Sequence, residues 1–466
     1  MINVVEKINS ISLPESLIRI SERIIEKGGK SYLVGGFVRD TLLGLKSKDY
    51  DIEIYNLELK DIIKILSDFG IPDLVGKSFG VMKLRVDKND YDFSLPRSDS
   101  KIGKGHKGFD VKSDPFMTFE EASFRRDFTI NSMGIEIPSK RFEDPHGGLK
   151  DLENKILRHV SEHFNEDPLR AMRAVQFAAR FEFEIPKETK EIISKQLLEE
   201  LPSERIFDEL KKLLLKSKKP SIGFEIIKEV GFLKYFPELK KIVGLQQDPE
   251  WHPEGDVWTH TMLALDQAAI IRDKEISEED EFKRLAYMLG VLAHDFGKSY
   301  TTIFKEGRWR SPSHEAAGEV PTRSFLSRLT KERKLIDLVV LYVTHHLRPS
   351  LLFKAKKVKK SAIRRLALKV NISDIVRINK ADHRGKLAVN DEFEAGDWLL
   401  EQAKNLDVIE EVPKPILTGK MLISLGVNPG PEMGEIIKES FDLQLDDKII
   451  SEEEALNWAR ERIKNA

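Results

Sequence analysis

The chain has 466 residues, a length that predicts about three or four domains rather than a single core. It contains no cysteine, which excludes disulfides and thiolate metal ligands and leaves oxygen and imidazole donors for any bound metal. The formal net charge is only −2, so contacts with nucleic acid must come from local basic patches.

The sequence carries no sign of a membrane segment. No apolar run approaches the roughly 18 residues that a bilayer-spanning helix needs. Glu6 and Lys7 stand where a signal peptide would be apolar. We therefore expect a cytoplasmic protein that makes no membrane contact.

The first strong motif lies between residues 32 and 55. An apolar run at 32–34 ends at Gly35 and Gly36, and an amphipathic turn that contains Arg39 follows. Two glycines at the start of a helix let phosphate oxygens approach backbone N–H groups, and an arginine on the first turn can neutralise their charge. The pattern predicts a strand, a glycine turn and a helix that together bind phosphate.

A second apolar run opens with two carboxylates, Asp49 and Asp51. Residues spaced i, i+2 on a strand share one face, where two negative charges repel unless a cation lies between them. The arrangement suits a pair of Mg²⁺ ions about 3.5–4 Å apart that activate a hydroxyl and hold a triphosphate. Either motif alone is weak, but the two at this spacing are specific.

Two further apolar alternating runs, Gly80 to Val86 and Tyr91 to Leu95, predict strands joined by a turn at 88–90. Asp92 lies in the second run. It is either a third carboxylate that faces the metals or an ordinary strand residue, and the spacing favours neither.

Polar residues from Arg97 to Thr118 show no periodicity, which predicts a mobile basic loop. Arg126, which follows, can meet phosphate or ribose, and Asp127 can cap a helix.

From about residue 150 the pattern is almost wholly helical. Pro168 marks a helix start with Asp167 before it as a cap. Asp167, Arg170 and Arg173 fall at i, i+3 and i+6 and share one helix face. The face is either a solvated polar stripe or part of a nucleotide site.

Histidines and aspartates recur through the region from residue 251 to 390. A single histidine on an apolar helix is usually a core residue. Five separate positions with histidine or aspartate are better explained as ligands of a divalent metal. Mg, Mn, Ni, Co, Fe or Zn would suit such donors. The predicted ligands are His260, His294, Asp295, His314, His345 and Asp382.

Taken in order, these motifs resemble the bacterial class II CCA-adding tRNA nucleotidyltransferases, within the tRNA nucleotidyltransferase and poly(A) polymerase family. From residue 251 the chain looks like the form that carries an HD domain, a helical metal-dependent phosphohydrolase. The matching stretches are 33–40 with 49–51, 125–131, 144–145 with Gly148, 166–170, 203–206, 251–254 with His260 and His294-Asp295, and 381–385.

The resemblance implies roles for individual residues. Asp49 and Asp51 would carry the catalytic Mg²⁺, and Asp167 and Arg170 would replace a nucleic-acid template, with Arg173 nearby. Relatives often carry an arginine where this chain has Gln176, which puts that triphosphate contact in doubt. The residues expected to hold the nucleotide are Gly35, Gly36, Arg39, Arg126, Asp127, Asn131, Asp167, Arg170 and Arg173.

The expected architecture is an α/β nucleotidyltransferase head followed by all-α domains. The predicted segments are an N-terminal helical segment (1–27), the head (28–145), a helical neck and body (146–250), an HD domain (251–390) and a helical tail (391–466). The expected partners are tRNA, CTP and ATP, and the oligomeric state, monomer or homodimer, stays open.

The expected reaction is transfer of CMP twice and AMP once to a tRNA 3′ end, with a second phosphohydrolase activity in the HD domain. A CC-adding or A-adding specialist and a poly(A) polymerase remain alternatives. From other classes, the alternatives are an HD phosphohydrolase with a regulatory nucleotide-binding head and a non-catalytic RNA-binding protein. The paired carboxylates argue against both.

Overall fold

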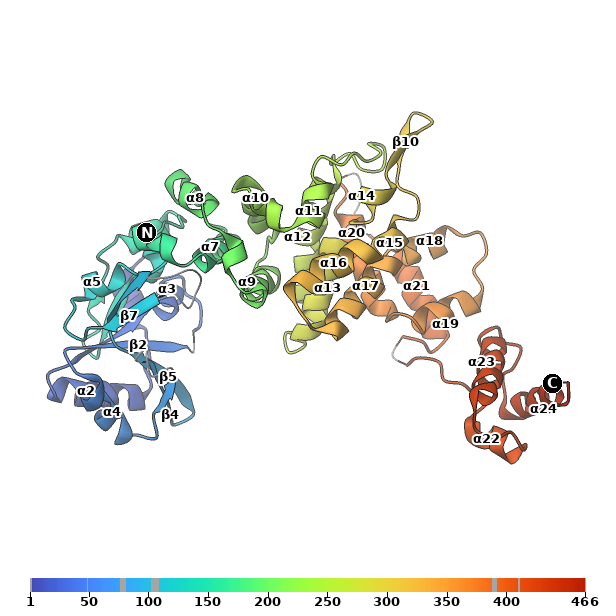
Figure 1. Cartoon of the computed structure of the whole chain (residues 1–466), viewed down its shortest axis with the longest axis horizontal. Helices are drawn as coiled ribbons and strands as arrows, with labels where there is room; N and C mark the ends of the chain where they lie inside the picture. Colours follow the sequence, from blue (N-terminus) through green and yellow to red (C-terminus); the bar gives the residue numbers. More distant parts are fainter. Residues whose placement is uncertain are drawn as a thin grey trace. The chain divides into compact units, whose positions relative to one another are not determined.

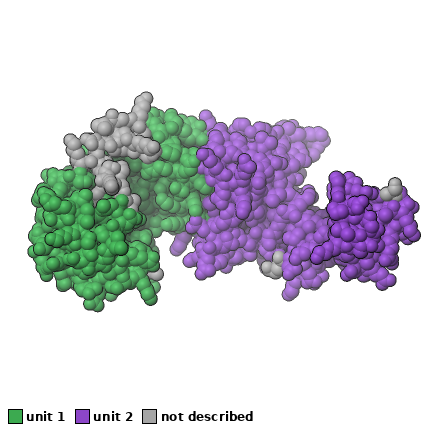
Figure 2. All heavy atoms as spheres, turned by 60° about the horizontal axis from the view of Figure 1, so that its bottom comes forward, with its two compact units in different colours: residues 1–217, 222–235 green, residues 218–221, 236–466 purple. Residues whose placement is uncertain are grey.

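A computed structural model describes residues 2–47, 49–75, 81–101, 109–387, 392–409 and 411–465. The chain divides into two compact units, one of residues 1–217 and 222–235 and the other of residues 218–221 and 236–466 (Figures 1 and 2). The first unit holds a mixed β-sheet and helices, whereas the second is almost wholly helical. The expected α/β head with helical domains is confirmed, and the five-segment division stays a prediction.

A seven-stranded sheet forms the centre of the first unit, in the order β3-β4-β5-β2-β1-β8-β9. Neighbouring strands run antiparallel except β2 and β5, which are parallel. Residues paired across parallel neighbours lie side by side on one face of the sheet, as Asp51 and Asp92 do. The strands are β1 (Lys30–Val34), β2 (Tyr50–Tyr55), β3 (Asp73–Val75), β4 (Val81–Val86), β5 (Asn89–Ser94), β8 (Gly134–Ile137) and β9 (Phe142–Glu143).

The predicted strand, glycine turn, helix and second strand are all present. Strand β1 ends at Val34, and Gly35 then takes φ 68° and ψ −130°. Residues that have a Cβ rarely adopt this backbone conformation. Helix α3 (Gly36–Leu42) follows at once, and β2 returns antiparallel to β1 with Leu33 opposite Ile52. The turn therefore brings the start of α3 close to the start of β2.

The β4–β5 hairpin turns one residue earlier than predicted. Asp87 and Lys88 have φ of 48° and 68°, so both central turn residues are left-handed, and β5 begins at Asn89. Such a two-residue turn matches the twist of the strands that it joins. The earlier turn leaves Asp92 inside β5, as expected, and Gly80 lies outside the described residues.

The prediction of a structureless loop between residues 97 and 118 is wrong for its described parts. Strands β6 (Arg97–Lys101) and β7 (Phe109–Ser113) pair antiparallel in a two-stranded sheet of their own. Polar strand residues such as Asp99 give no apolar alternation, so the pattern lacked the usual strand signal. The glycine-containing part, residues 102–108, lies outside the described residues.

Helices cover the sheet and extend beyond it in the first unit. Helix α2 packs on β1 and α4, and α7 packs on α9. The backbone N–H of Leu169, the first residue of α7, donates to Asp167 Oδ1 at 3.0 Å, as the cap predicts. The helices are α1 (Val4–Asn9), α2 (Glu15–Glu26), α4 (Leu59–Ser67), α5 (Phe119–Ser123), α6 (Gly148–Glu153), α7 (Leu169–Phe181), α8 (Lys187–Ser194), α9 (Ser203–Lys216), α10 (Ser221–Glu229) and the 3₁₀ turns Thr129–Asn131, Glu162–Glu166, Leu198–Glu200 and Phe232–Tyr235.

The second unit is built on four helices, α12, α13, α17 and α20, that pack against one another. Trp258, Tyr287 and Tyr342 are each only 1% exposed and form part of the core between them. This bundle fixes the ends of helices that carry the histidines. The elements are α11 (Pro237–Ile242), α12 (Val257–Glu275), α13 (Glu281–Ala293), α14 (Lys298–Thr301), β10 (Ile303–Lys305), β11 (Arg308–Arg310), α15 (His314–Ala317), α16 (Glu319–Leu329), α17 (Arg333–His345), α18 (Arg348–Lys354), α19 (Lys360–Ala367), α20 (Ile372–Arg384) and α21 (Glu394–Asn405).

The tail has an apolar cluster of its own. Helices α22 (Gly419–Ser424), α23 (Pro431–Leu445) and α24 (Glu452–Lys464) enclose buried residues that include Leu422 and Ile436. Among the described residues, no helix combines the length and the apolar character that crossing a bilayer requires.

Candidate functional site

Three carboxylates converge at the start of β2 and in the neighbouring strand β5. Asp51 pairs in register with Asp92 across the parallel strands, and Asp49 precedes β2 directly. Burial by surrounding protein raises the pKa of the Asp51 carboxyl; the charge of Arg126 lowers it, and those of Asp92 and Asp49 raise it further. The structure thus brings Asp92 beside the other two, which favours the reading of Asp92 as a third member of the set.

The donor set fits Mg²⁺. All three side chains offer only oxygen atoms, which Mg²⁺ prefers, and their like charges destabilise the ionised state unless a cation is near. Lys83 supplies a partial balance, with its Nζ 3.4 Å from Asp92 Oδ2, but no such ion pair to Asp49 or Asp51 is found among the described residues.

Gly35 and Arg126 line the same space as Asp51. A Cβ placed on Gly35 would lie 3.5 Å from Arg126 Nη1 and 3.8 Å from Asp51 Oδ2. The absence of a side chain therefore keeps open the gap between the guanidinium and the carboxylate. A phosphate group in this gap would meet a cation on one side and a cation-binding carboxylate on the other.

Glu53 is a buried residue of the candidate site that the sequence reasoning missed. Its carboxylate is 1% exposed and accepts from Arg125 Nη2 at 2.7 Å, Arg126 Nη2 at 3.3 Å and the Tyr55 hydroxyl at 2.7 Å. Burial alone would raise the pKa of Glu53, but the charges of Arg126 and Arg125 outweigh it and lower the pKa. Glu53 continues the i, i+2 series from Asp51, and this signal could have identified it.

Arg39 is buried rather than open to a phosphate. Its Nε and Nη2 donate to Asp40 Oδ1 at 2.9 and 2.7 Å, and its Nη1 donates to Asn131 Oδ1 at 2.7 Å. The guanidinium also lies over the rings of Phe177 and Phe181 on α7, 5.0 and 4.7 Å from their centroids. These contacts turn the side chain into the interior, where it joins α3 to α7, and the phosphate contact of Arg39 stays a prediction.

The polar chain continues from Asn131 to α7. Asn131 Nδ2 donates to Asp127 Oδ1 at 2.9 Å, and Arg173 Nε and Nη2 lie 2.8 Å from Asp127 Oδ2. Burial would raise the pKa of Asp127, but Arg173 and Asn131 hold it below its ordinary value. Asp127 and Asn131 are thus buried links between the head and α7, with Arg173 as the half-buried end of the chain.

Arg170 is held by main-chain oxygens on two sides. Its Nη1 donates to the carbonyl of His163 at 2.6 Å and its Nη2 to that of Arg125 at 2.7 Å. These bonds fix the plane of the guanidinium, and the backbone N–H of Arg170 donates to the Asp167 carbonyl at 3.0 Å. Gln176, deeper on α7, is 2% exposed, and its Nε2 has no hydrogen-bond partner among the described residues.

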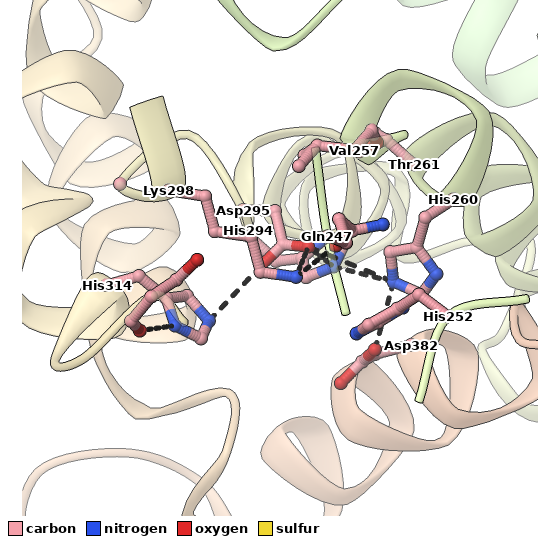
Figure 3. A network of polar contacts seen from close by, with 12 residues as sticks. Gln247, His252, Val257, His260, Thr261, His294, Asp295, Lys298, His314 and Asp382 are labelled. Atoms are coloured by element: carbon pink, nitrogen blue, oxygen red, sulfur yellow. Dashed lines mark hydrogen bonds and ion pairs between the residues drawn. The ribbon is translucent and has the colours of Figure 1, made fainter. Parts of the chain in front are cut away.

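A second cluster lies in the other unit, where His260, His294 and Asp382 meet (Figure 3). They come from α12, from the end of α13 and from α20. His260 Nε2 lies 3.1 Å from Asp382 Oδ1 and 3.4 Å from His294 Nε2. Helices distant in sequence thus place three donor atoms around one point.

Asp295 links this group to a further group that includes His314 and His346. Its Oδ2 lies 3.2 Å from His294 Nε2, and its Oδ1 lies 3.2 Å from His314 Nε2. Each carboxylate oxygen therefore faces a different group, and the cluster offers places for two cations joined by Asp295.

Each histidine ring is oriented by its other nitrogen. Nδ1 of His294, His314 and His346 lies 2.7–2.9 Å from the main-chain carbonyl three residues earlier, and His260 Nδ1 lies 2.9 Å from Glu254 Oε1. These contacts direct every Nε2 inward, as in metal sites. His346 Nε2 has no hydrogen-bond partner in the described part of the chain, so its lone pair can bind a cation.

The prediction of His345 as a ligand is wrong, because its neighbour His346 occupies the cluster. His345 Nδ1 lies 3.0 Å from the Leu341 carbonyl, and its ring lines a separate cavity with Arg348 and Lys369. Apolar burial along α17 includes Val339 and Val343, which lie seven and three residues before 346. That periodicity could have selected His346.

The electrostatics of the cluster favour charged carboxylates and a neutral His346. Burial would raise the pKa of Asp295, but His294 and Lys298 hold it well below its ordinary value. Burial lowers the pKa of His346 to about 3, because its neighbours His294 and His314 add to the penalty on the charged form. A neutral imidazole is the form that binds metal.

Gly297 makes the approach of His314 possible. A Cβ at this position would overlap the His314 carbonyl oxygen and lie 2.6 Å from the Gly318 nitrogen. We expect Gly297→Ala to push α15 away from Asp295, lower stability by about 2 kcal/mol and weaken metal retention. Thermal unfolding and metal analysis of the purified protein test this.

Gly434→Ala is the matched control, because nothing lies within 4 Å of its Cβ position on the exposed face of α23. The control should leave the melting temperature unchanged or slightly raised. Equal melting temperatures and metal contents for the two variants would show that the close contact at Gly297 is unimportant.

Comparisons with known proteins agree with the geometry. Residues 31–158 match the family described as "Poly A polymerase head domain", and residues 182–243 match "Probable RNA and SrmB- binding site of polymerase A". A multifunctional CCA protein from Mannheimia succiniciproducens is 34% identical over 77% of this chain and 84% of its own length. Another, from Pasteurella multocida, is 36% identical over 68% of this chain and 74% of its own length.

A solved structure shares the fold. The Thermotoga maritima CCA-adding enzyme, complexed with tRNA, aligns over 99% of this chain and 98% of its own with a TM-score of 0.62. Its sequence identity is 20%, so this likeness concerns the fold alone. The two closer sequence relatives carry the assignment: the chain belongs to the family of multifunctional CCA proteins.

Proposed function

We propose that the head adds C, C and A in turn to the 3′ end of tRNA from CTP and ATP. The observation that carries this proposal is the convergence of Asp49, Asp51 and Asp92 beside Gly35 and Arg126. Relatives named multifunctional CCA proteins, and a CCA-adding enzyme of the same fold bound to tRNA, support the same activity.

The side chains of the head divide the work of nucleotidyl transfer. Mg²⁺ held by Asp49 and Asp51 would supply activation of the terminal ribose hydroxyl and neutralisation of the triphosphate charge. Arg126, held in place by Glu53, offers its guanidinium to the phosphates. Asp92 adds a third carboxylate, and no side chain need act as a nucleophile.

Nucleotide selection is proposed for Asp167 and Arg170. A donor-only guanidinium and an acceptor-only carboxylate together match the pairing edge of cytosine, and of adenine after a small shift. The main-chain bonds of Arg170 support this role, because they hold the guanidinium in one plane. Arg173 is proposed to support the site through Asp127.

We further propose that the second cluster is an HD-type metal-dependent phosphohydrolase site. Imidazole and carboxylate donors suit Mn, Fe, Ni, Co, Zn or Mg. Bound cations would supply charge for a phosphate ester and a deprotonated water. Lys298 supports the proposal: its Nζ lies 2.7 Å from Asp295 Oδ2 and donates to Gln247 Oε1 at 2.6 Å, so a cation already stands beside the cluster.

The first test of the head uses Asp51→Asn. With labelled CTP or ATP and tRNAs that lack CCA or end in CC, the wild type should extend both, and the variant should lose at least about a hundredfold in rate because its charge is gone. Asp90→Asn, an exposed aspartate on the same strand as Asp92, is the control and should retain activity.

Two outcomes would contradict the assignment. If Asp51→Asn extended tRNA at nearly the wild-type rate, the carboxylates would not be catalytic. Extension by the wild type of only the tRNA that ends in CC, or only of the tRNA that lacks CCA, would identify an A-adding or CC-adding specialist instead.

The second cluster is tested with two adjacent histidines. His346→Ala should reduce bound metal and hydrolysis of phosphate esters by tenfold or more, because it removes an inward-facing Nε2. His345→Ala should change neither, since its ring faces another cavity. Inductively coupled plasma mass spectrometry and phosphate release measure the two effects, and CMP addition by the head should be unaffected.

The reverse pattern, with metal lost in His345→Ala and kept in His346→Ala, would contradict the cluster. Absence of hydrolysis in the wild type with every divalent metal tried would contradict the enzymatic role and leave a structural one.

Selection is tested with Arg170→Ala. An incorrect base leaves one buried group unpaired, at a cost of about 1–3 kcal/mol, so the wild type should favour CTP over UTP by tenfold or more. The variant should lose most of that preference while its KM for CTP rises less. Steady-state incorporation of both nucleotides measures the ratio. A variant with slower incorporation but an unchanged CTP-to-UTP ratio would make Arg170 a packing residue.

A further inference from the structure

A cavity of about 280 Å³ opens onto the metal-ligand cluster. Its wall is formed by residues of the metal-ligand cluster, together with three lysines and two tryptophans. Groups that suit phosphate chemistry and large aromatic surfaces therefore face the same space. The lining residues used below are Asp295, Asp382, Lys298, Lys354, Lys386, Trp251 and Trp309.

The two tryptophans are held at the cavity by different segments. Trp251 closes the turn at 248–251 and is 60% exposed, whereas Trp309 lies on β11 and is half-buried. Arg308 ties the hairpin to this turn, because its Nε lies 2.7 Å from Asp248 Oδ2. An indole left 60% exposed beside a polar cavity is typical of a ligand contact rather than of a core.

Positive charge lines the cavity both at the cluster and at one of the indoles. Lys298 Nζ contacts Asp295, Lys386 Nζ lies 3.8 Å from Asp382 Oδ1, and Lys354 Nζ lies 5.5 Å from the centroid of the Trp251 ring. A ligand that complements these groups carries both an anionic group and a flat ring. A nucleotide has both, whereas a base-free phosphate ester would leave the indoles uncovered.

We propose that Trp251 and Trp309 bind the base of a nucleotide whose phosphate reaches the cluster. The site then selects nucleotides, free or at an RNA 3′ end, over base-free phosphate esters. This inference rests on the proposed phosphohydrolase role of the cluster. Stacking of a base on an aromatic side chain is worth about 1–3 kcal/mol by alanine substitution, which corresponds to roughly five- to 150-fold in binding.

The test is isothermal titration of the full chain, without added metal, with AMP and with ribose 5-phosphate. Wild type should bind AMP at least about tenfold more tightly. Trp251→Leu and Trp309→Leu should weaken AMP binding by tenfold or more and leave ribose 5-phosphate binding unchanged. Any AMP bound by the head is insensitive to these substitutions, so the loss reports on the cavity.

Tyr300→Leu is the matched control. Tyr300 is another exposed ring with a lysine over it, Lys241 Nζ at 4.6 Å from the centroid, but it does not line the cavity. Its variant should bind AMP as wild type does. A short RNA with a 3′-phosphate provides a further arm: if it binds more tightly than AMP, and loses that binding in Trp251→Leu, the RNA end is the natural ligand.

Equal affinity of wild type for AMP and ribose 5-phosphate, or unchanged AMP affinity in both tryptophan variants, would overturn the proposal. A variant that loses both ligands has a disturbed cavity, and Trp309→Phe then decides, because it keeps a stacking ring and should retain AMP binding. Base-dependent binding without any hydrolysis would contradict the phosphohydrolase role alone and leave the base contact intact.

Discussion

Repulsion among Asp49, Asp51 and Asp92 is the constraint around which the head is built. The parallel pairing of β2 with β5 holds Asp51 and Asp92 side by side, and burial together with these charges raises the pKa of Asp51. Such an arrangement costs free energy unless cations and an anionic substrate complete it. The head is thus organised for ligands that balance its charges, which suits Mg²⁺ and a nucleoside triphosphate.

Buried ion pairs behind the carboxylates keep the site in place. Glu53 binds Arg125 and Arg126 from within β2, and Asp127 binds Arg173 on α7. Breaking one partner of such a buried pair leaves an uncompensated charge, which typically costs about 3–5 kcal/mol. Strand, loop and helix are therefore coupled, and the guanidinium of Arg126 is held near Gly35 and Asp51.

The sequence predicted those features that depend on local spacing. Two glycines after a strand predicted the turn at Gly35, and the i, i+2 rule placed Asp49 and Asp51 together. The prediction selected His345 instead of His346, although the buried positions Val339 and Val343 on α17 point to His346. The sequence could not show that the Arg39 side chain lies among Asp40, Asn131 and the α7 rings, because a motif gives position along the chain but not side-chain direction.

The central claim is that two chemically distinct sets of ligands, one of carboxylates and one of imidazoles with carboxylates, bind cations in one chain. Anomalous diffraction from crystals of the full chain soaked in Mn²⁺ tests this most directly, because Mn²⁺ accepts both oxygen and imidazole donors. The account predicts one set of peaks beside Asp49 and Asp51 and another beside Asp295. A map with no peak beside Asp51 would contradict it.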